Sequence, residues 1–226
     1  MSMNELFGLA GAKPKLITRY TSAAPTGTYV PTVDNARCLV RIQGGGGGGW
    51  SAAGSGGGGG AMVEVFIRIP IAGLAYIVGA GGTVTVNGSD SKLGNYIAQG
   101  GRCPTGSIAP GLGGFLGNMA GSVDADSAAF TASNPLPGVA GGGGGYNTST
   151  HGQVAGYPIP INSVLSTGSM YVYATSNGQG LGGGGNSFFG LGGAPGSSAG
   201  ATEYGAGGGS QGSGCAGLIE IWDFGA

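Results

Sequence analysis

Residues 36–61 read ARCLVRIQGGGGGGWSAAGSGGGGGA. The first eight residues alternate in the pattern of a half-buried strand, and six uninterrupted glycines follow before Trp50. Glycine has no side chain to bury and loses the most backbone freedom on ordering, so hydrophobic burial cannot hold this run in place. Backbone hydrogen bonding remains, and the way it is satisfied decides the fold.

An extended glycine run can adopt the left-handed polyproline II conformation, which has three residues per turn, a rise of about 3.1 Å per residue and no internal hydrogen bonds. Without Cβ atoms, neighbouring runs can approach closely enough to bond backbone to backbone, as in collagen. Further runs occur at irregular spacing, which does not indicate a solenoid repeat. We therefore predict packed polyglycine II helices whose structural positions include Gly44, Gly46, Gly49, Gly56, Gly60, Gly141, Gly145, Gly182 and Gly185.

The composition places the chain near low-complexity sequences, with 57 glycines and 11 prolines among 226 residues. Disordered chains are usually polar and charged, however, whereas here charged residues make up 8 % and apolar residues 40 %. We expect an ordered domain over residues 28–226. Residues 1–27 are not glycine-rich, and they form either an ordered edge or a segment that docks on a partner.

Alternating side chains predict strands at both ends of the glycine-rich region. Residues 36–43, 61–69 and 218–224 each place apolar side chains on one face, the pattern of a half-buried strand. We expect the two ends of the chain to meet in one sheet. Arg37 or Arg41 facing Glu64 or Glu220 would then offset charges on its outer face.

Two further short strands are predicted at residues 75–79 and 83–86, the second ending at Asn87-Gly, a hairpin-type turn signal. Helical periodicity is absent beyond Asp90. The predicted fold class is all-β with packed polyglycine II helices. Antiparallel strands come from both chain ends, and loops lie at the ends of the glycine-helix bundle.

Charge and cysteine usage exclude several classes of partner. The formal net charge is −1 and no basic stripe covers the domain, so nucleic-acid binding is not expected. The longest apolar run, residues 69–80, contains Pro70 and is too short for a membrane span. Cys38, Cys103 and Cys215 form no CxxC pair and the chain has one histidine, which excludes a recognisable zinc site. The three cysteines are most simply interpreted as small apolar residues or free thiols, and we expect no metal and no cofactor.

Several blocks of the sequence follow one another in a characteristic order: residues 31–50, 76–82 with 90–97, 182–190, 204–209 and 217–222. These blocks resemble the glycine-rich domain of phage and prophage tail-fibre proteins, which are adhesin-like. The resemblance covers residues 28–224, and the order of the blocks is more specific than the glycine content. The resemblance implies polyglycine helices packed side by side, with variable loops at one end that touch the host surface.

Catalytic patterns carry little weight in this composition. Residues 208–212 match G-x-S-x-G, but such matches arise by chance among so many glycines, and His151 precedes the serine, against the α/β-hydrolase order. Asp124 and Asp126 could form a glycosidase pair, although two carboxylates this close in a small-residue loop are more often a solvated turn. We expect no enzymatic activity.

Recognition remains, and it falls on the longer excursions between glycine runs. Tyrosine mixed with Asn, Ser and Gly gives stiff amphipathic area and adaptable hydrogen bonds, as in antibody paratopes. The candidate receptor contacts are Tyr146, Asn147, His151, Tyr157 and Tyr204. Phe130, Phe188 and Phe189 are interpreted as core plugs of the bundle, and Trp50 as a cap over the two runs that it joins.

The function predicted from the resemblance is a virion component of a phage tail, a tail fibre or tip protein that attaches to the host by receptor binding. It would be made in the host cytoplasm and dock through residues 1–27 on other tail proteins. Its partner would be a bacterial surface protein or glycan, and homotrimers are expected by analogy alone. The alternatives are a purely structural virion protein (collar, baseplate or head fibre) and an ice-binding polyglycine bundle.

Overall fold

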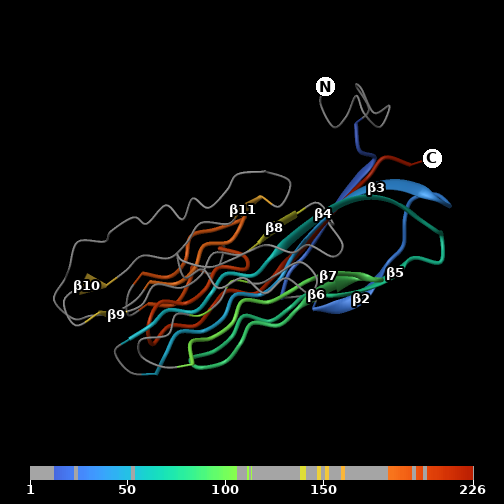
Figure 1. The fold of residues 1–226 in the computed structure, drawn as a ribbon. Coiled ribbons are helices and arrows are strands. Elements are labelled where there is room, and N and C mark those ends of the chain that lie inside the picture. Colours follow the sequence, from blue (N-terminus) through green and yellow to red (C-terminus); the bar gives the residue numbers. More distant parts are fainter. Residues whose placement is uncertain are drawn as a thin grey trace.

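The computed structural model describes residues 13–22, 25–51, 54–105, 111, 113, 183–194, 197–200 and 203–225, with the backbone of short strands at 138–140, 147–148, 151–152 and 159–160. The described part is built from antiparallel β-strands and contains no helix (Figure 1). The all-β part of the prediction is therefore confirmed.

The larger sheet joins strands from both ends of the chain. Its order is β1 (Leu16–Tyr20), β12 (Leu218–Asp223), β3 (Ala36–Gln43), β4 (Met62–Ile69), β8 (Gly138–Ala140) and β11 (Ile159–Pro160). All neighbours in it are antiparallel. The pairing of β1 with β12 confirms that the chain ends share one sheet. Within residues 1–27, the stretch that forms β1 is thus an ordered edge.

The second sheet has the order β2 (Thr26–Tyr29), β5 (Leu74–Ile77), β6 (Ser91–Leu93) and β7 (Tyr96–Ala98). A two-residue turn joins β6 to β7, and Gly94 in that turn has a φ of 55° in the left-handed region, where glycine is favoured. This hairpin was not among the predicted strands. A separate pair, β9 (Asn147–Thr148) with β10 (His151–Gly152), forms a two-stranded sheet.

The hydrophobic core lies between the two sheets, because alternate residues of each strand point to opposite faces. Val40, Ile42 and Val63 from the larger sheet are fully buried, and Tyr76 and Leu93 from the smaller sheet belong to the same cluster. The inward positions predicted for residues 36–43, 61–69 and 218–224 are confirmed in this cluster, apart from Asp223, a buried carboxylate among apolar residues.

Strands continue directly into glycine-rich segments, which lie side by side and lead away from the two sheets (Figure 1). Residues 44–49 follow β3, residues 56–61 precede β4, residues 99–103 follow β7 and residues 212–217 precede β12. The chain therefore runs without a break from the strands of the two sheets into the glycine-rich part.

All six residues from 44 to 49 are buried, and each donates its N–H to a different segment in rotation. Gly44 and Gly47 donate to segment 56–61, Gly45 and Gly48 to segment 86–89, and Gly46 and Gly49 to segment 212–217, at 2.8–3.0 Å. The acceptor segment thus repeats every third residue. Backbone hydrogen bonds hold this run, as its lack of side chains requires.

The strand predicted at residues 83–86 is wrong. These residues form a turn in which the Val86 N–H donates to the Thr83 carbonyl at 2.9 Å and Thr85 has a φ of 63°. The segment 79–83 and the segment 86–89 both contact residues 44–49, so the chain must reverse between them. The alternation of threonine and valine is typical of a strand, but tertiary pairing overrides that propensity here.

Candidate functional site

The predicted contact residues fall largely outside the described residues. Tyr146 and Tyr157 lie outside them, and only the backbone is described for Asn147 and His151, which the structure brings into the β9–β10 pair. Tyr204 is half-buried, its carbonyl accepts a hydrogen bond from the Ser187 hydroxyl at 2.6 Å, and the Arg19 guanidinium lies 5.8 Å from its ring centre. Tyr204 therefore lies beside the larger sheet.

The predicted structural glycines also fall partly within and partly outside the described residues. Gly44, Gly46, Gly49, Gly56, Gly60 and Gly185 are all buried, whereas Gly141, Gly145 and Gly182 lie outside the described residues. A Cβ added at Gly46 would overlap the backbone carbonyl of Ala206. Only glycine fits at this close approach, which explains the residue type without any ligand.

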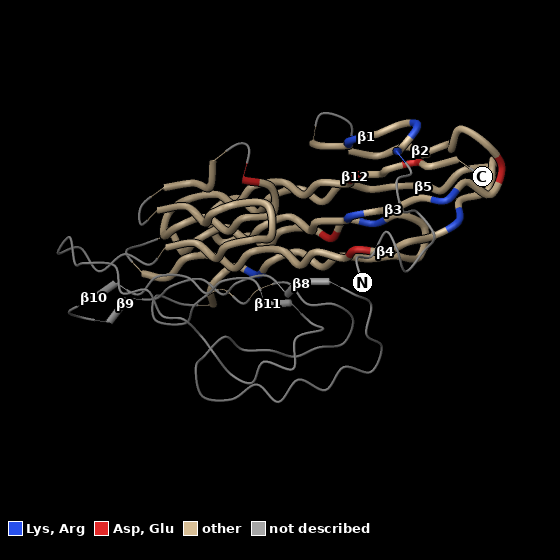
Figure 2. Tube along the Cα trace, turned by 90° about the horizontal axis from the view of Figure 1, so that it is seen from above, with Lys and Arg blue, Asp and Glu red and all other residues tan. Residues whose placement is uncertain are grey.

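The described surface that gathers the most side-chain chemistry is the outer face of β1, β12, β3 and β4, here called the outer face. Figure 2 shows that most charged residues lie over these strands, while the glycine-rich part is almost free of them. Because the pairing is antiparallel and in register, the outward side chains form three rows across the four strands.

The row nearest the glycine-rich part consists of compensated charges: Arg19, Glu220, Arg41 and Glu64. Arg19 pairs with Glu220, its Nε donating to Oε1 at 2.8 Å, and Arg41 Nε pairs with Glu64 Oε2 at 2.5 Å. The Arg41 guanidinium also lies 5.0 Å from the Trp222 ring centre. The predicted offset of Arg41 by Glu64 is thus confirmed.

Phe188 also lies near Arg41, with its ring centre 5.8 Å from the guanidinium carbon. The Phe188 residue is 46 % exposed, so the interpretation of Phe188 as a buried plug is wrong. An arginine stacked on an aromatic ring keeps its charge near water, and the ring can stay at the surface as well. Phe189, in edge-to-face contact with Phe188 at 5.1 Å, is half-buried, and Phe130 lies outside the described residues.

The middle row is apolar throughout: Ile17, Trp222, Leu39 and Phe66. Registers in adjacent strands place Ile17 opposite Trp222, Trp222 opposite Leu39 and Leu39 opposite Phe66. The Ile17 residue is 60 % exposed, and the other three are partly exposed. A continuous apolar row on a sheet face that also carries charges is a feature of interaction surfaces.

The third row is cationic and contains Lys15, Phe224, Arg37 and Arg68. Arg37 faces Arg68 directly in the β3–β4 register, so of the two arginines that the sequence offered for pairing with a glutamate, Arg41 has that position and Arg37 does not. Like charges directly opposite each other destabilise a sheet. Among the described residues, Arg37 Nε is buried without a hydrogen-bond partner, and Arg68 Nη1 donates only to the Asn35 carbonyl at 3.3 Å.

Buried hydrogen bonds beneath the cationic row fix its position. The carboxylate of Asp223 accepts hydrogen bonds from the Tyr29 hydroxyl at 3.0 Å, the Thr32 N–H at 2.7 Å and the Gly225 N–H at 2.7 Å. Burial alone raises the pKa of Asp223, but these hydrogen bonds outweigh it and hold the pKa below its usual value. The bonds hold the end of β12 in place, so Phe224 lies beside Arg37.

The thiols of Cys38 and Cys215 are buried. Cys38 lies in the core, and burial, helped by the neighbouring Asp223 charge, raises its pKa to about 12. Burial also raises the pKa of Cys215. No disulfide joins Cys38, Cys103 and Cys215.

Sequence reasoning placed these side chains on one face of each strand but did not find the three rows. The alternation gives the face, whereas the rows depend on the pairing register, which determines that Arg37 meets Arg68 and not Glu64. No helix in the part of the chain that the structure describes is long and apolar enough to cross a membrane. No protein-family model matches the chain, and no curated protein matches it either.

Proposed function

We propose that the chain is a virion component of a phage tail that attaches to the host, without catalytic activity, and that its glycine-rich segments form a bundle of polyglycine II helices. The observation that supports this bundle is that the segment accepting each N–H along residues 44–49 repeats every third residue. A helix with three residues per turn and no internal bonds presents its N–H groups in this rotation.

The acceptor side of the same run supports the bundle. The carbonyl of Gly45 accepts from Gly101, that of Gly46 from Gly82 and that of Gly47 from Gly208, so three further segments donate to the run. Residues 44–49 thus exchange backbone hydrogen bonds with six segments. Packing of one helix among six neighbours uses its N–H and C=O groups in every direction and leaves no room for side chains.

Loops attached to such a scaffold can vary without disturbing it, because the backbone bonds do not depend on their side chains. This arrangement supports host attachment through Tyr146, Asn147, His151 and Tyr157 as the proposed contact residues. The order of glycine-rich blocks, which resembles tail-fibre domains, supports placing the chain in a phage tail. Tyr204 belongs with the outer face, since Arg19 stacks on its ring.

Immunogold labelling tests the virion assignment. Antibodies against the purified chain are applied to phage particles induced from the strain that encodes it, and we expect gold at the tail. Particles that carry tails but bind no gold would overturn the proposal. Pre-immune antibodies on the same particles give the control.

A separate observation favours the alternative of a purely structural virion protein: the outer face has an apolar row beside uncompensated cations. Purified chain added to host cells before infection distinguishes the two. A protein that touches the receptor reduces plaque numbers in proportion to its concentration. A structural protein labels particles but leaves plaque numbers unchanged.

A further inference from the structure

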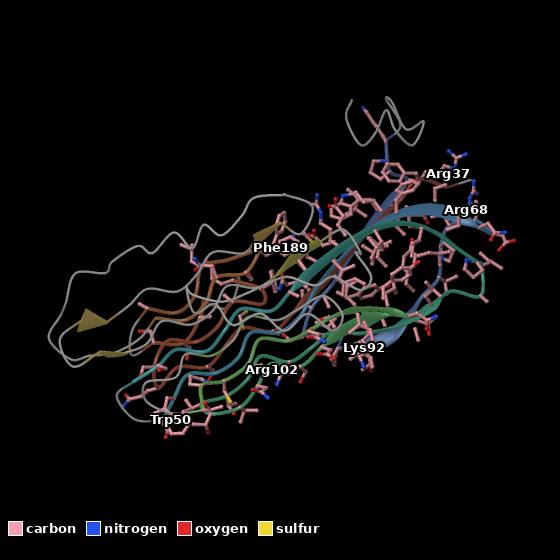
Figure 3. All side chains as sticks on the ribbon, viewed as in Figure 1. Arg37, Trp50, Arg68, Lys92, Arg102 and Phe189 are labelled. Carbon is pink, nitrogen blue, oxygen red and sulfur yellow. The ribbon has the colours of Figure 1, made fainter. Side chains whose placement is uncertain are left out.

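We propose that the outer face docks a carboxylate-bearing segment of another protein. Acidic side chains of the partner would bind Arg37, Arg68 and Lys15, and apolar side chains would cover Trp222, Leu39 and Phe66. This inference does not depend on the phage assignment, because it follows from the rows of the outer face alone. Figure 3 shows Arg37 and Arg68 together at the end of the sheets away from the glycine-rich part.

The cationic row carries the charge argument. Arg37 and Arg68 stand opposite each other, and Lys15 lies beside Gly225 close by, since a Cβ at Gly225 would come within 2.6 Å of Lys15 Nζ. The nearest carboxylates described on this face, Glu220 and Glu64, already bind Arg19 and Arg41. Repulsion between opposed arginines is relieved when a carboxylate bridges them.

The buried Nε of Arg37 adds an independent reason for an acceptor at this place. Buried polar groups in proteins are almost always hydrogen-bonded, and among the described residues this donor has no partner. A carboxylate can accept two hydrogen bonds from one guanidinium. A partner carboxylate would therefore give Arg37 an acceptor that the described residues do not supply.

The apolar row favours an acidic protein over other anionic partners such as nucleic acid. Trp222, Leu39 and Phe66 form a continuous row next to the cations, and Phe224 packs against Phe66 with ring centres 6.3 Å apart. Aromatic side chains and arginine are the residue types enriched at the centres of protein interfaces. A phosphate backbone would satisfy the cations but leave this row uncovered.

A second copy of the same face is disfavoured as the occupant. The described face has no carboxylate that is not already paired with an arginine of its own chain. Two such faces would bring cationic rows together or break existing ion pairs. The occupant should therefore supply carboxylates that this chain does not offer here.

The test uses the full chain carrying Trp50→Phe, so that Trp222 is the remaining tryptophan of the two in the sequence. The probe is a short peptide alternating glutamate and leucine, and the matched control peptide replaces each glutamate with lysine. We expect the acidic peptide to shift Trp222 emission, with an affinity that falls as salt is added. The lysine peptide should give no shift.

Variants then locate the binding. Arg37→Gln with Arg68→Gln should weaken the acidic peptide roughly tenfold or more, whereas Arg102→Gln, which removes an exposed charge from the glycine-rich part (Figure 3), should leave affinity unchanged. Equal binding of both peptides, or equal affinity of the double variant and wild type, overturns the proposal. Melting curves of each variant confirm that it is folded.

Two other occupants are separated by the same assay. Tighter binding of a DNA duplex than of the acidic peptide, lost in the double variant, would overturn the proposal in favour of nucleic acid. The assay is repeated on a chain that lacks residues 1–12. If this chain binds the acidic peptide and the full chain does not, the proposal is overturned, and the occupant is the protein's own N-terminal residues. Equal binding by both chains supports an external partner.

Discussion

The hydroxyl of Tyr29 donates a hydrogen bond to the carboxylate of Asp223 at 3.0 Å, joining two residues that are 194 positions apart in the chain. Both side chains are buried, and Asp223 has two further donors from the backbone. The bond ties the smaller sheet to the last strand of the larger one, beneath the cationic row.

Tyr29→Phe removes this hydroxyl and leaves a buried carboxylate with one donor fewer. We expect the free energy of unfolding to fall by roughly 1–3 kcal/mol, the cost of weakening hydrogen bonding to a buried charged group. Urea denaturation measures the change. Tyr96→Phe is the control, since no hydrogen bond of its hydroxyl occurs among the described residues, and it should change stability by less than about 0.5 kcal/mol.

Asp223 should also make stability depend on pH. Its pKa is lower in the folded protein than its ordinary value, so it contributes stability above the unfolded pKa of about 3.9 and loses it as the pH falls through the folded pKa. We expect the urea midpoint to drop in acid. Asp223→Asn should be less stable near neutral pH and should show a smaller drop in acid. An unchanged slope in that variant would contradict the role given to Asp223.

Gly46→Val tests the close approach of glycine-rich segments. The new side chain would overlap the Ala206 carbonyl, which is backbone and cannot move aside, so we expect destabilisation by more than about 3 kcal/mol or failure to fold. Ala80→Val adds two methyl groups at an exposed position of a neighbouring segment and should have little effect. A Gly46→Val protein with the wild-type melting temperature would rule out the close packing.

Arg68→Glu tests the opposition of the two arginines. A carboxylate opposite Arg37 replaces repulsion with attraction, so the free energy of unfolding should rise by up to about 1 kcal/mol. The melting temperature measures the gain. Arg102→Glu makes the same charge change in the glycine-rich part, and an equal gain there would show that overall charge, and not the facing pair, is responsible.

Thiol reactivity should separate the three cysteines. Cys38 is 0 % exposed and Cys215 is 8 % exposed, and burial raises the pKa of both thiols, so both should react slowly with a disulfide reagent. Cys103 is half-buried and should react first. The Cys103→Ser variant should lose the fast phase, and a fast phase that persists would contradict the burial of the other two.

Side-chain alternation was enough to predict the core faces of β3, β4 and β12, because a period of two leaves one face for the core. It could not predict the register, so it left open whether Arg37 or Arg41 faces a glutamate; Arg41 faces Glu64 and Arg37 faces Arg68. At residues 83–86 the local pattern itself was misleading. The sequence is strand-like, but it forms a turn because the two segments that flank it both contact residues 44–49.

The candidate site was less predictable than the fold. Phe188 was interpreted as a core plug of the bundle, and nothing in the sequence indicates that Arg41, more than 140 positions earlier, lies over its ring. The outer face depends on strands that are far apart in the chain. Its residues were visible in the sequence, but their assembly into rows was not.

Consecutive residues of the run 44–49 are anchored to three different segments, and this has a mechanical consequence. A force pulling along the run cannot unzip it one bond at a time, because the load is shared among neighbours on all sides and the bonds must shear together. Strand β3 continues into this run, so tension applied at the sheets passes along the main chain into the interior of the glycine-rich part.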